Sequence, residues 1–238
     1  MKEKDLPFDR EKHVCYSPKT KKLMLEHLRR RYPAEEAARL WEKLQMQYVD
    51  FLKDLPYLGG KACTHNGAGG TYDCIALFAC YEVQEQKPTL GELYEMNCQT
   101  FLPSFALIGK LVDLNRPFLL RLLHRVFAAT AEKDRVYAMD QPTGYRMEVE
   151  PYDEKAGIHY CFRQCPVAEF ARAHHYLDLM PAFCNGDYPG IAYMHGRLIR
   201  THTCANGELC DYWIVGDKSP CLQEHPQKTD EKGYWYNP

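Results

Sequence analysis

The spacing of the apolar residues changes near residue 144, and this change most constrains the fold. Before it, apolar residues recur at helical intervals, as at Leu40, Leu44 and Tyr48. After it, apolar and polar residues alternate, as in residues 158–162, which is typical of strands with one buried face. The sequence therefore predicts an α+β fold in which an N-terminal helical half packs on a C-terminal antiparallel sheet.

The first half is expected to contain five helices. Their starts are expected near residues 17, 34, 72, 89 and 116. Tyr32-Pro33 should end the first helix, because the residue before a proline disfavours the helical backbone. Thr89 and Glu92 have the spacing of a capping box at the start of the fourth helix.

The second half is expected to contain strands with one inserted helix. The strands are expected at residues 145–149, 158–162, 198–204 and 209–215, and the helix at 167–183. Asn206-Gly207 is the strongest hairpin signal in the chain. The expected organisation is a flexible arm (1–16), a single domain (17–216) and a C-terminal tail (217–238). The domain has a helical half (17–135) and a sheet half (145–216) that carries the site.

Composition and charge narrow the class of protein. The net charge of −2 argues against nucleic acid as the partner, because phosphate binding needs a clustered basic excess. No run of residues has the length and apolarity of a membrane span, and the charged N-terminus has no signal-peptide core, so we expect a cytoplasmic protein that binds no membrane. The eleven cysteines are then expected to be reduced, and no CxxC pair is present.

Thiol and carboxylate residues that could carry chemistry gather in the C-terminal third. They are Cys161, Cys165, Cys184, Asp187, Cys204, Cys210 and Asp211. Cys165 precedes a predicted helix, whose dipole and free N–H groups would lower the pKa of its thiol. In one interpretation Cys165, Cys184, Asp187 and Cys210 surround one pocket. In the other, the cysteines fill the core and Asp187 caps a turn, since buried free cysteine is common and usually inert.

The glycine-rich stretch at residues 59–70 reads as a loop. It lacks the Lys-Ser/Thr ending of a phosphate-binding loop and the GxGxxG spacing, so nucleotide binding is not expected. The loop could still bring Asn66 to the rim of the pocket.

Several short motifs resemble the L-2-amino-thiazoline-4-carboxylic acid hydrolase family. They are Cys165-Pro166, Cys184-Asn185-Gly186-Asp187, Leu198-Ile199-Arg200-Thr201 and the run from Asn206 to Tyr212, with Leu58-Gly59-Gly60-Lys61 and Asn66 upstream. The resemblance spans roughly residues 20–215, and its C-terminal third is the specific part. The ending also resembles the 4-vinyl-reductase-type small-molecule-binding domains.

The resemblance implies a hydrolase that opens a cyclic amidine by water addition, giving N-carbamoyl-cysteine from 2-amino-thiazoline-4-carboxylate. Asp187 or Asp211 could act as base or hold the amidinium. A thiolate such as Cys165 could instead attack directly, and Cys210 is a further candidate catalytic residue. Arg200 could bind the substrate carboxylate, with Thr201 and Asn66 as further substrate-binding residues.

Other possibilities remain open at the level of sequence. Zinc or iron held by Cys165, Cys184, Asp187 and Cys210 would activate water on the metal. A small-molecule or metal sensor without turnover could use the same pocket. A redox role for the thiols has the least support, because no CxxC pair is present. A homo-oligomer is compatible with all of these.

Overall fold

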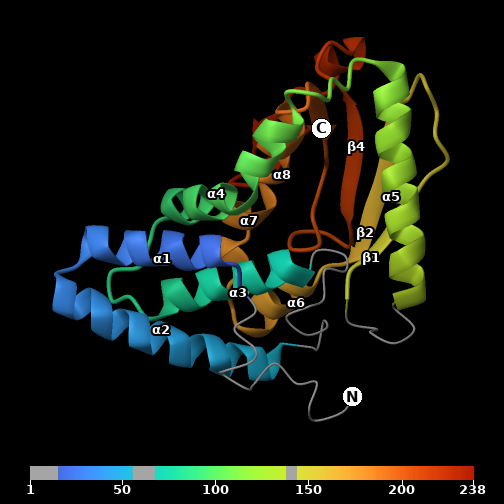
Figure 1. Cartoon of the computed structure of the whole chain (residues 1–238). Coiled ribbons are helices and arrows are strands. Elements are labelled where there is room, and N and C mark those ends of the chain that lie inside the picture. Colours follow the sequence, from blue (N-terminus) through green and yellow to red (C-terminus); the bar gives the residue numbers. More distant parts are fainter. Residues whose placement is uncertain (1–15, 56–67, 138–143) are drawn as a thin grey trace. The chain divides into compact units, whose positions relative to one another are not determined.

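The computed structural model describes residues 16–55, 68–137 and 144–238. The chain divides into two compact units, Met1–Thr100 and Phe101–Pro238, and the division falls within helix α4 (Leu90–Ile108). Figure 1 shows the order of the elements along the chain. The expected α+β class is confirmed, with helices in the N-terminal half and an antiparallel sheet in the C-terminal part.

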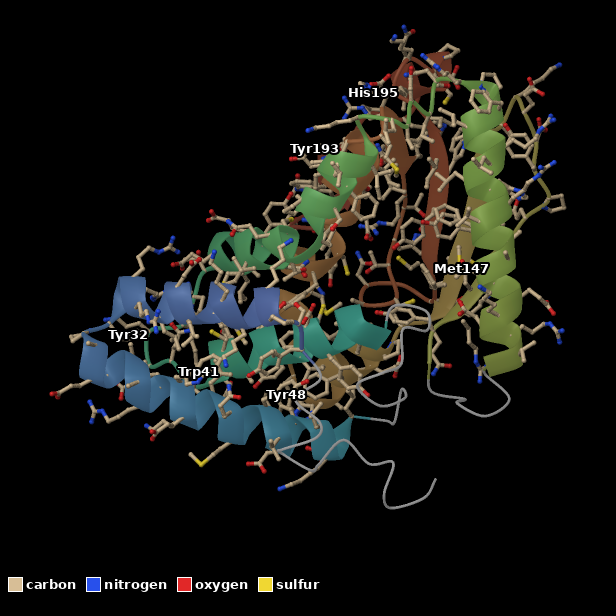
Figure 2. The ribbon with its side chains drawn as sticks, viewed as in Figure 1. Tyr32, Trp41, Tyr48, Met147, Tyr193 and His195 are labelled. Atoms are coloured by element: carbon tan, nitrogen blue, oxygen red, sulfur yellow. The ribbon has the colours of Figure 1, made fainter. Side chains whose placement is uncertain are left out.

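The first unit is built from helices. Its described elements are α1 (Pro18–Arg31), α2 (Ala34–Asp54), α3 (Ala68–Glu82) and the first part of α4. Helix α2 packs against α1 and α3, and its Tyr48 (Figure 2) is buried with its ring 4.9 Å from that of Tyr16. Helix α3 begins at Ala68, so Gly69 and Gly70 belong to a helix rather than to the expected loop.

Side chains cap the starts of two helices in the first unit. Ser17 caps α1, because its hydroxyl accepts the N–H of Thr20 at 3.2 Å. At α4 the N–H of Thr89 donates to Glu92 Oε2 at 2.8 Å, and the N–H of Glu92 donates to Thr89 Oγ1 at 3.2 Å. The predicted capping box is therefore confirmed.

The second unit contains a four-stranded antiparallel sheet. Its strands lie in the order β1 (Arg146–Val149), β2 (Ile158–Gln164), β4 (Cys210–Gly216) and β3 (Gly196–Ile199). Tyr160 pairs with Tyr212, and Cys161 pairs with Asp211. Because side chains alternate along a strand, the two tyrosines lie on one face, and Cys161 and Asp211 lie on the other.

Helix α5 (Pro117–Tyr137) covers the face that carries the tyrosines. It packs against β1 and β2 (Figure 1), and the ring of Phe127 lies 4.8 Å from that of Tyr160. Met147 of β1 (Figure 2) is buried and lines a second hollow with α5. Residues of α5 and the two tyrosines of the sheet also line a cavity, which is described with the candidate site below.

The prediction of a single helix at residues 167–183 is wrong. The structure has α6 (Pro166–Ala173), a 3-10 turn η2 (Leu177–Leu179), α7 (Pro181–Cys184) and α8 (Asp187–Ala192). His175 has a φ of 61°, a left-handed conformation that ends α6. Pro181, which has no backbone N–H, begins α7 at the position where a helix tolerates it.

The predicted hairpin has a shorter first strand and a longer connection than expected, whereas its second strand, β4, has the predicted length. Strand β3 ends at Ile199, and residues 200–209 form a loop. The N–H groups of Asn206 and Gly207 both donate to the carbonyl oxygen of Thr203, so the turn lies inside this loop. The first strand stops because Thr201 and His202 donate their N–H groups to the side chain of Asp211 instead of to a strand.

The segment expected as a C-terminal tail (217–238) is part of the second unit and packs within it. It contains a 3-10 turn η3 (Pro220–Gln223) and a small hairpin of β5 (Lys228–Thr229) and β6 (Trp235–Tyr236). Asn185, which follows α7, donates its Nδ2 to the carbonyl oxygen of Gly233 at 2.8 Å and accepts the N–H of Trp235 at 3.0 Å.

None of the helices in the described part of the chain combines the length and the apolar character that crossing a membrane requires.

Candidate functional site

Asp187, Arg200 and Tyr212 come together from three different elements of the second unit. Asp187 opens α8, Arg200 follows β3, and Tyr212 lies in β4. Nη1 of Arg200 donates to Oδ2 of Asp187 at 2.7 Å, and the Tyr212 hydroxyl donates to the same oxygen at 2.8 Å. Oδ1 of Asp187 accepts no hydrogen bond from any residue that the structure describes. One carboxylate oxygen is therefore anchored while the other is available to a ligand.

The Arg200 side chain is fully buried, which is unusual for a charged group. Its Nη2 donates to the carbonyl oxygen of Cys184 at 2.8 Å, and its guanidinium lies 5.1 Å from the ring centre of Tyr188 and 5.4 Å from that of Tyr212. Within the described ranges, Asp187 is the only carboxylate with which it forms an ion pair. Because a buried charge needs a partner, this pairing fixes the position of Asp187 as much as that of Arg200.

The C-terminal segment forms hydrogen bonds with the backbone of the same arginine. The N–H of Asn237 donates to the carbonyl oxygen of Arg200 at 2.7 Å, and the Arg200 N–H donates to Asn237 Oδ1 at 3.3 Å. The hydroxyl of Tyr188 donates to the carbonyl oxygen of Trp235 at 2.9 Å. Segments far apart in the sequence thus fix the backbone on which the site is built.

Asp187 lines a cavity of about 600 Å³ within the second unit. Apolar residues form most of its wall: Phe101 and Phe105 of α4, Leu119, Leu123 and Phe127 of α5, and Ile191 of α8. The polar groups in the wall come from Asp187, Tyr160 and Tyr212. A mostly apolar cavity of this size with a few convergent polar groups is typical of a small-molecule site.

The two tyrosines in the cavity wall stack on each other. Their ring centres lie 4.4 Å apart and the ring planes differ by 12°. Burial raises the pKa of both hydroxyls well above the usual range, and the nearby charge of Asp187 raises it further. Both therefore remain neutral hydrogen-bond donors at ordinary pH.

The thiols near Arg200 are neutral as well. Burial raises the pKa of Cys210 to about 12 and that of Cys184 well above its usual value, although the charge of Arg200 opposes the shift in both. Burial also raises the pKa of Cys165, even though the N–H groups of Val167 and Ala168 favour its thiolate. This direction is opposite to the one expected from the helix start, because burial outweighs those N–H groups.

Asp211 and Thr201 lie apart from this group. The Thr201 N–H and hydroxyl donate to Asp211 Oδ2 at 2.8 and 2.9 Å, and the His202 N–H donates to Oδ1 at 2.8 Å. Thr201 is exposed, and Asp211 points to the sheet face opposite Tyr212. Their contacts stabilise the loop after β3. Asn66 lies outside the described residues.

The prediction that Cys165, Cys184, Asp187 and Cys210 bind a metal stays a prediction, and the described geometry gives it no support. In residues 16–55, 68–137 and 144–238, no group of three or more His, Cys, Asp or Glu side chains is arranged to hold a metal ion. The guanidinium of Arg200 instead directs Nη1 at both Asp187 Oδ2 and, at 3.8 Å, Cys210 Sγ. A positive side chain thus contacts two of the four predicted donors.

Sequence reasoning identified Asp187, Arg200 and Cys210 but missed three parts of the site. It assigned no role to Tyr160 and Tyr212, although their alternation with polar neighbours marks them as members of one buried face. It also missed the cavity wall on α5 and the contact of Asn237 with Arg200. No local pattern in the sequence signals either of the last two features.

Comparison with known proteins supports the resemblance over the part of the chain that holds this site. No curated protein and no solved structure matches the chain. Residues 112–214 match the model of a protein family, and this range includes α5, α8, Asp187, Arg200 and Tyr212. The resemblance to 4-vinyl-reductase-type domains stays a prediction. Over residues 112–214 the expected resemblance is confirmed: this region matches the L-2-amino-thiazoline-4-carboxylic acid hydrolase family, whose name is that of a hydrolase.

Proposed function

We propose that this protein is a hydrolase that opens a cyclic amidine of the 2-amino-thiazoline type, with Asp187 as the catalytic group. The observation that carries the proposal is the anchoring of Asp187 Oδ2 by Arg200 and Tyr212 while Oδ1 remains available in the wall of a small-molecule cavity. The match of residues 112–214 to a family named for such a hydrolase supports it.

The reaction adds water to the ring carbon that lies between nitrogen and sulfur. Oδ1 of Asp187 takes a proton from water as the new carbon–oxygen bond forms, and the anchored Oδ2 keeps the carboxylate in position. Asp187 returns this proton to the ring nitrogen. The carbon–sulfur bond then breaks, the added hydroxyl passes its remaining proton to the leaving sulfur and becomes a carbonyl oxygen, and sulfur is released as a free thiol. The product is an N-carbamoyl aminothiol, which is N-carbamoyl-cysteine when the ring carries the 4-carboxylate.

The neighbouring groups favour this acid–base route over a thiol nucleophile. Cys165, Cys184 and Cys210 all have raised pKa values because they are buried, so little thiolate is present at neutral pH. The neutral hydroxyl of Tyr160 lines the same cavity and can donate to the oxygen or nitrogen that gains charge in the reaction.

The test compares Asp187 with Asp211, another carboxylate of the second unit. Free thiol released from 2-amino-2-thiazoline and from its 4-carboxylate is measured for the parent, Asp187→Asn and Asp211→Asn. We expect Asp187→Asn to lower kcat by about 100-fold or more, and Asp211→Asn to stay within a few-fold of the parent. An unchanged Asp187→Asn enzyme, or a parent that releases no thiol from either ring, would overturn the proposal.

A binding module without turnover is the second candidate, and the apolar wall of the cavity favours it. Such a wall supplies affinity without chemistry. Stoichiometric binding of an aminothiazoline that is recovered unchanged would support this function over hydrolysis.

A further inference from the structure

Apart from Asp187, no charged side chain lines the cavity in the described part of the chain. We propose that the substrate is an amidine with an apolar substituent and no carboxylate group. The inference rests on the proposed hydrolase function, because it names the substrate class of the same site.

The apolar wall is much larger than a bare heterocycle needs. Phenylalanine and leucine side chains from α4 and α5 face a space of about 600 Å³, to which Val112 and Met194 also contribute. A five-membered ring held at Asp187 would leave most of this apolar surface in contact with water. An apolar substituent on the ring would bury it, and each added methylene group should tighten binding about fourfold.

The charges in the site disfavour a carboxylate on the substrate. The guanidinium of Arg200 is not placed to bind one, because its side chain is fully buried, does not line the cavity, and donates through its Nη atoms to Asp187, Cys184 and Cys210. A substrate carboxylate would instead enter an apolar cavity whose one charged residue in the described wall is also negative. Such a carboxylate would lie against apolar side chains and near the Asp187 carboxylate, with no positive partner in the described wall, so we expect the site to prefer a neutral or cationic molecule.

The exposed part of the wall indicates where the substituent lies. Ile108, Leu122 and Val126 line the cavity and keep exposed fractions of 44, 52 and 52 %. Leu122 and Val126 are four residues apart on α5, so they lie on one face of the helix. With the amidine at Asp187, the substituent would extend along this face.

The first test uses a series of 2-amino-2-thiazolines that carry a carboxylate, methyl, propyl or phenethyl group at ring position 4. Thiol release gives kcat/KM, and isothermal titration gives binding for parent and Asp187→Asn proteins independently of turnover. We expect kcat/KM to rise about fourfold per methylene from methyl to propyl. The carboxylate should be at least about tenfold poorer than the methyl compound. A carboxylate that is the best substrate would overturn the inference and leave the hydrolase proposal intact.

The binding data separate the two proposals. If the alkyl compounds bind in the expected order, bind more weakly to Asp187→Asn, and are recovered unchanged, the inference about the ligand stands and the hydrolase proposal fails. If affinity does not increase with the alkyl group, the inference about the ligand is wrong.

The second test adds a positive charge to the wall. Val126→Lys places an ammonium group beside the cavity, and Val136→Lys is its control, because Val136 lies on the same helix with an exposed fraction of 54 % but does not line the cavity. We expect Val126→Lys to improve kcat/KM for the carboxylate relative to the methyl compound by about threefold, since exposed ion pairs are weak. Val136→Lys should leave that ratio at the parent value. Equal ratios in both variants would contradict the placement of the substituent along α5.

Discussion

The carbonyl oxygen of Arg200 accepts the N–H of Asn237 at 2.7 Å, and the side chain of Asn237 accepts the N–H of Arg200 at 3.3 Å. Asn237 is itself buried, and its Oδ1 also accepts the hydroxyl of Tyr188 at 3.2 Å. The C-terminal segment therefore supplies the hydrogen-bond partners of the Arg200 backbone, which lies just beyond the end of β3. It holds the backbone of the residue whose side chain positions Asp187.

Removing the Asn237 side chain should loosen this support. Asn237→Ala leaves the Arg200 N–H and the Tyr188 hydroxyl with one acceptor fewer in a buried place, so the free energy of unfolding should fall by about 1–3 kcal/mol. The rate of thiol release should fall as well, because Asp187 is held through Arg200. Denaturant unfolding and the aminothiazoline assay measure the two effects. Lys228→Ala, an exposed change in the same segment, is the control and should match the parent.

The hydroxyl of Tyr212 is expected to act on kcat more than on stability. Tyr212→Phe removes one of the two hydrogen bonds to Asp187 Oδ2 but keeps the ring that stacks on Tyr160. We expect kcat to fall about tenfold with little change in KM, and the free energy of unfolding to fall by about 1 kcal/mol. Tyr193→Phe, at an exposed tyrosine (Figure 2), serves as control. A loss confined to KM would show that Tyr212 binds substrate rather than positions Asp187.

The elements of the fold could be predicted where the determining residues are neighbours in sequence. The capping box of Thr89 and Glu92 is set by residues three positions apart, and the buried face of β2 is set by its alternation. The break at His175 could not be predicted, because residues other than glycine adopt a positive φ only in a few per cent of cases and no adjacent residue signals one here. The end of β3 depends on Asp211, which competes for the N–H groups of Thr201 and His202 from across the hairpin.

The candidate site also has features that could be predicted from the sequence and features that could not. Residue type and family resemblance pointed to Asp187, Arg200 and Cys210. The choice of Asp187 as the partner of Arg200, and the burial that keeps the Cys210 thiol neutral, follow from packing between distant segments. Contacts between segments that are distant in the sequence produce no characteristic residue spacing, so they could not be inferred from the sequence.

We expect a chelator to leave the activity of the protein unchanged. Because Arg200 already places a positive charge against Asp187 and Cys210, we expect less than one zinc or iron per chain by mass spectrometry of anaerobically purified protein. Dialysis against EDTA should leave the rate of thiol release and the melting temperature unchanged. Stoichiometric zinc or iron that is lost in Cys165→Ser, Cys184→Ser and Cys210→Ser alike would restore the metal-binding interpretation.

The neutral thiol of Cys210 predicts a loss of stability in alkali. Burial raises its pKa from the usual 9.0 to about 12, so the thiol is protonated in both folded and unfolded chains below pH 9. Between pH 9 and 12 the unfolded chain loses this proton while the folded chain keeps it, and the free energy of unfolding must fall as the pH rises.

Cys210→Ala removes the contribution, so its stability should fall less steeply between pH 8 and 10 than that of the parent. Val215→Ala, a truncation at a buried residue of the same strand that does not titrate, should keep the parent slope. Equal slopes for parent and Cys210→Ala in denaturant titrations would show that the thiol is not held neutral in the fold.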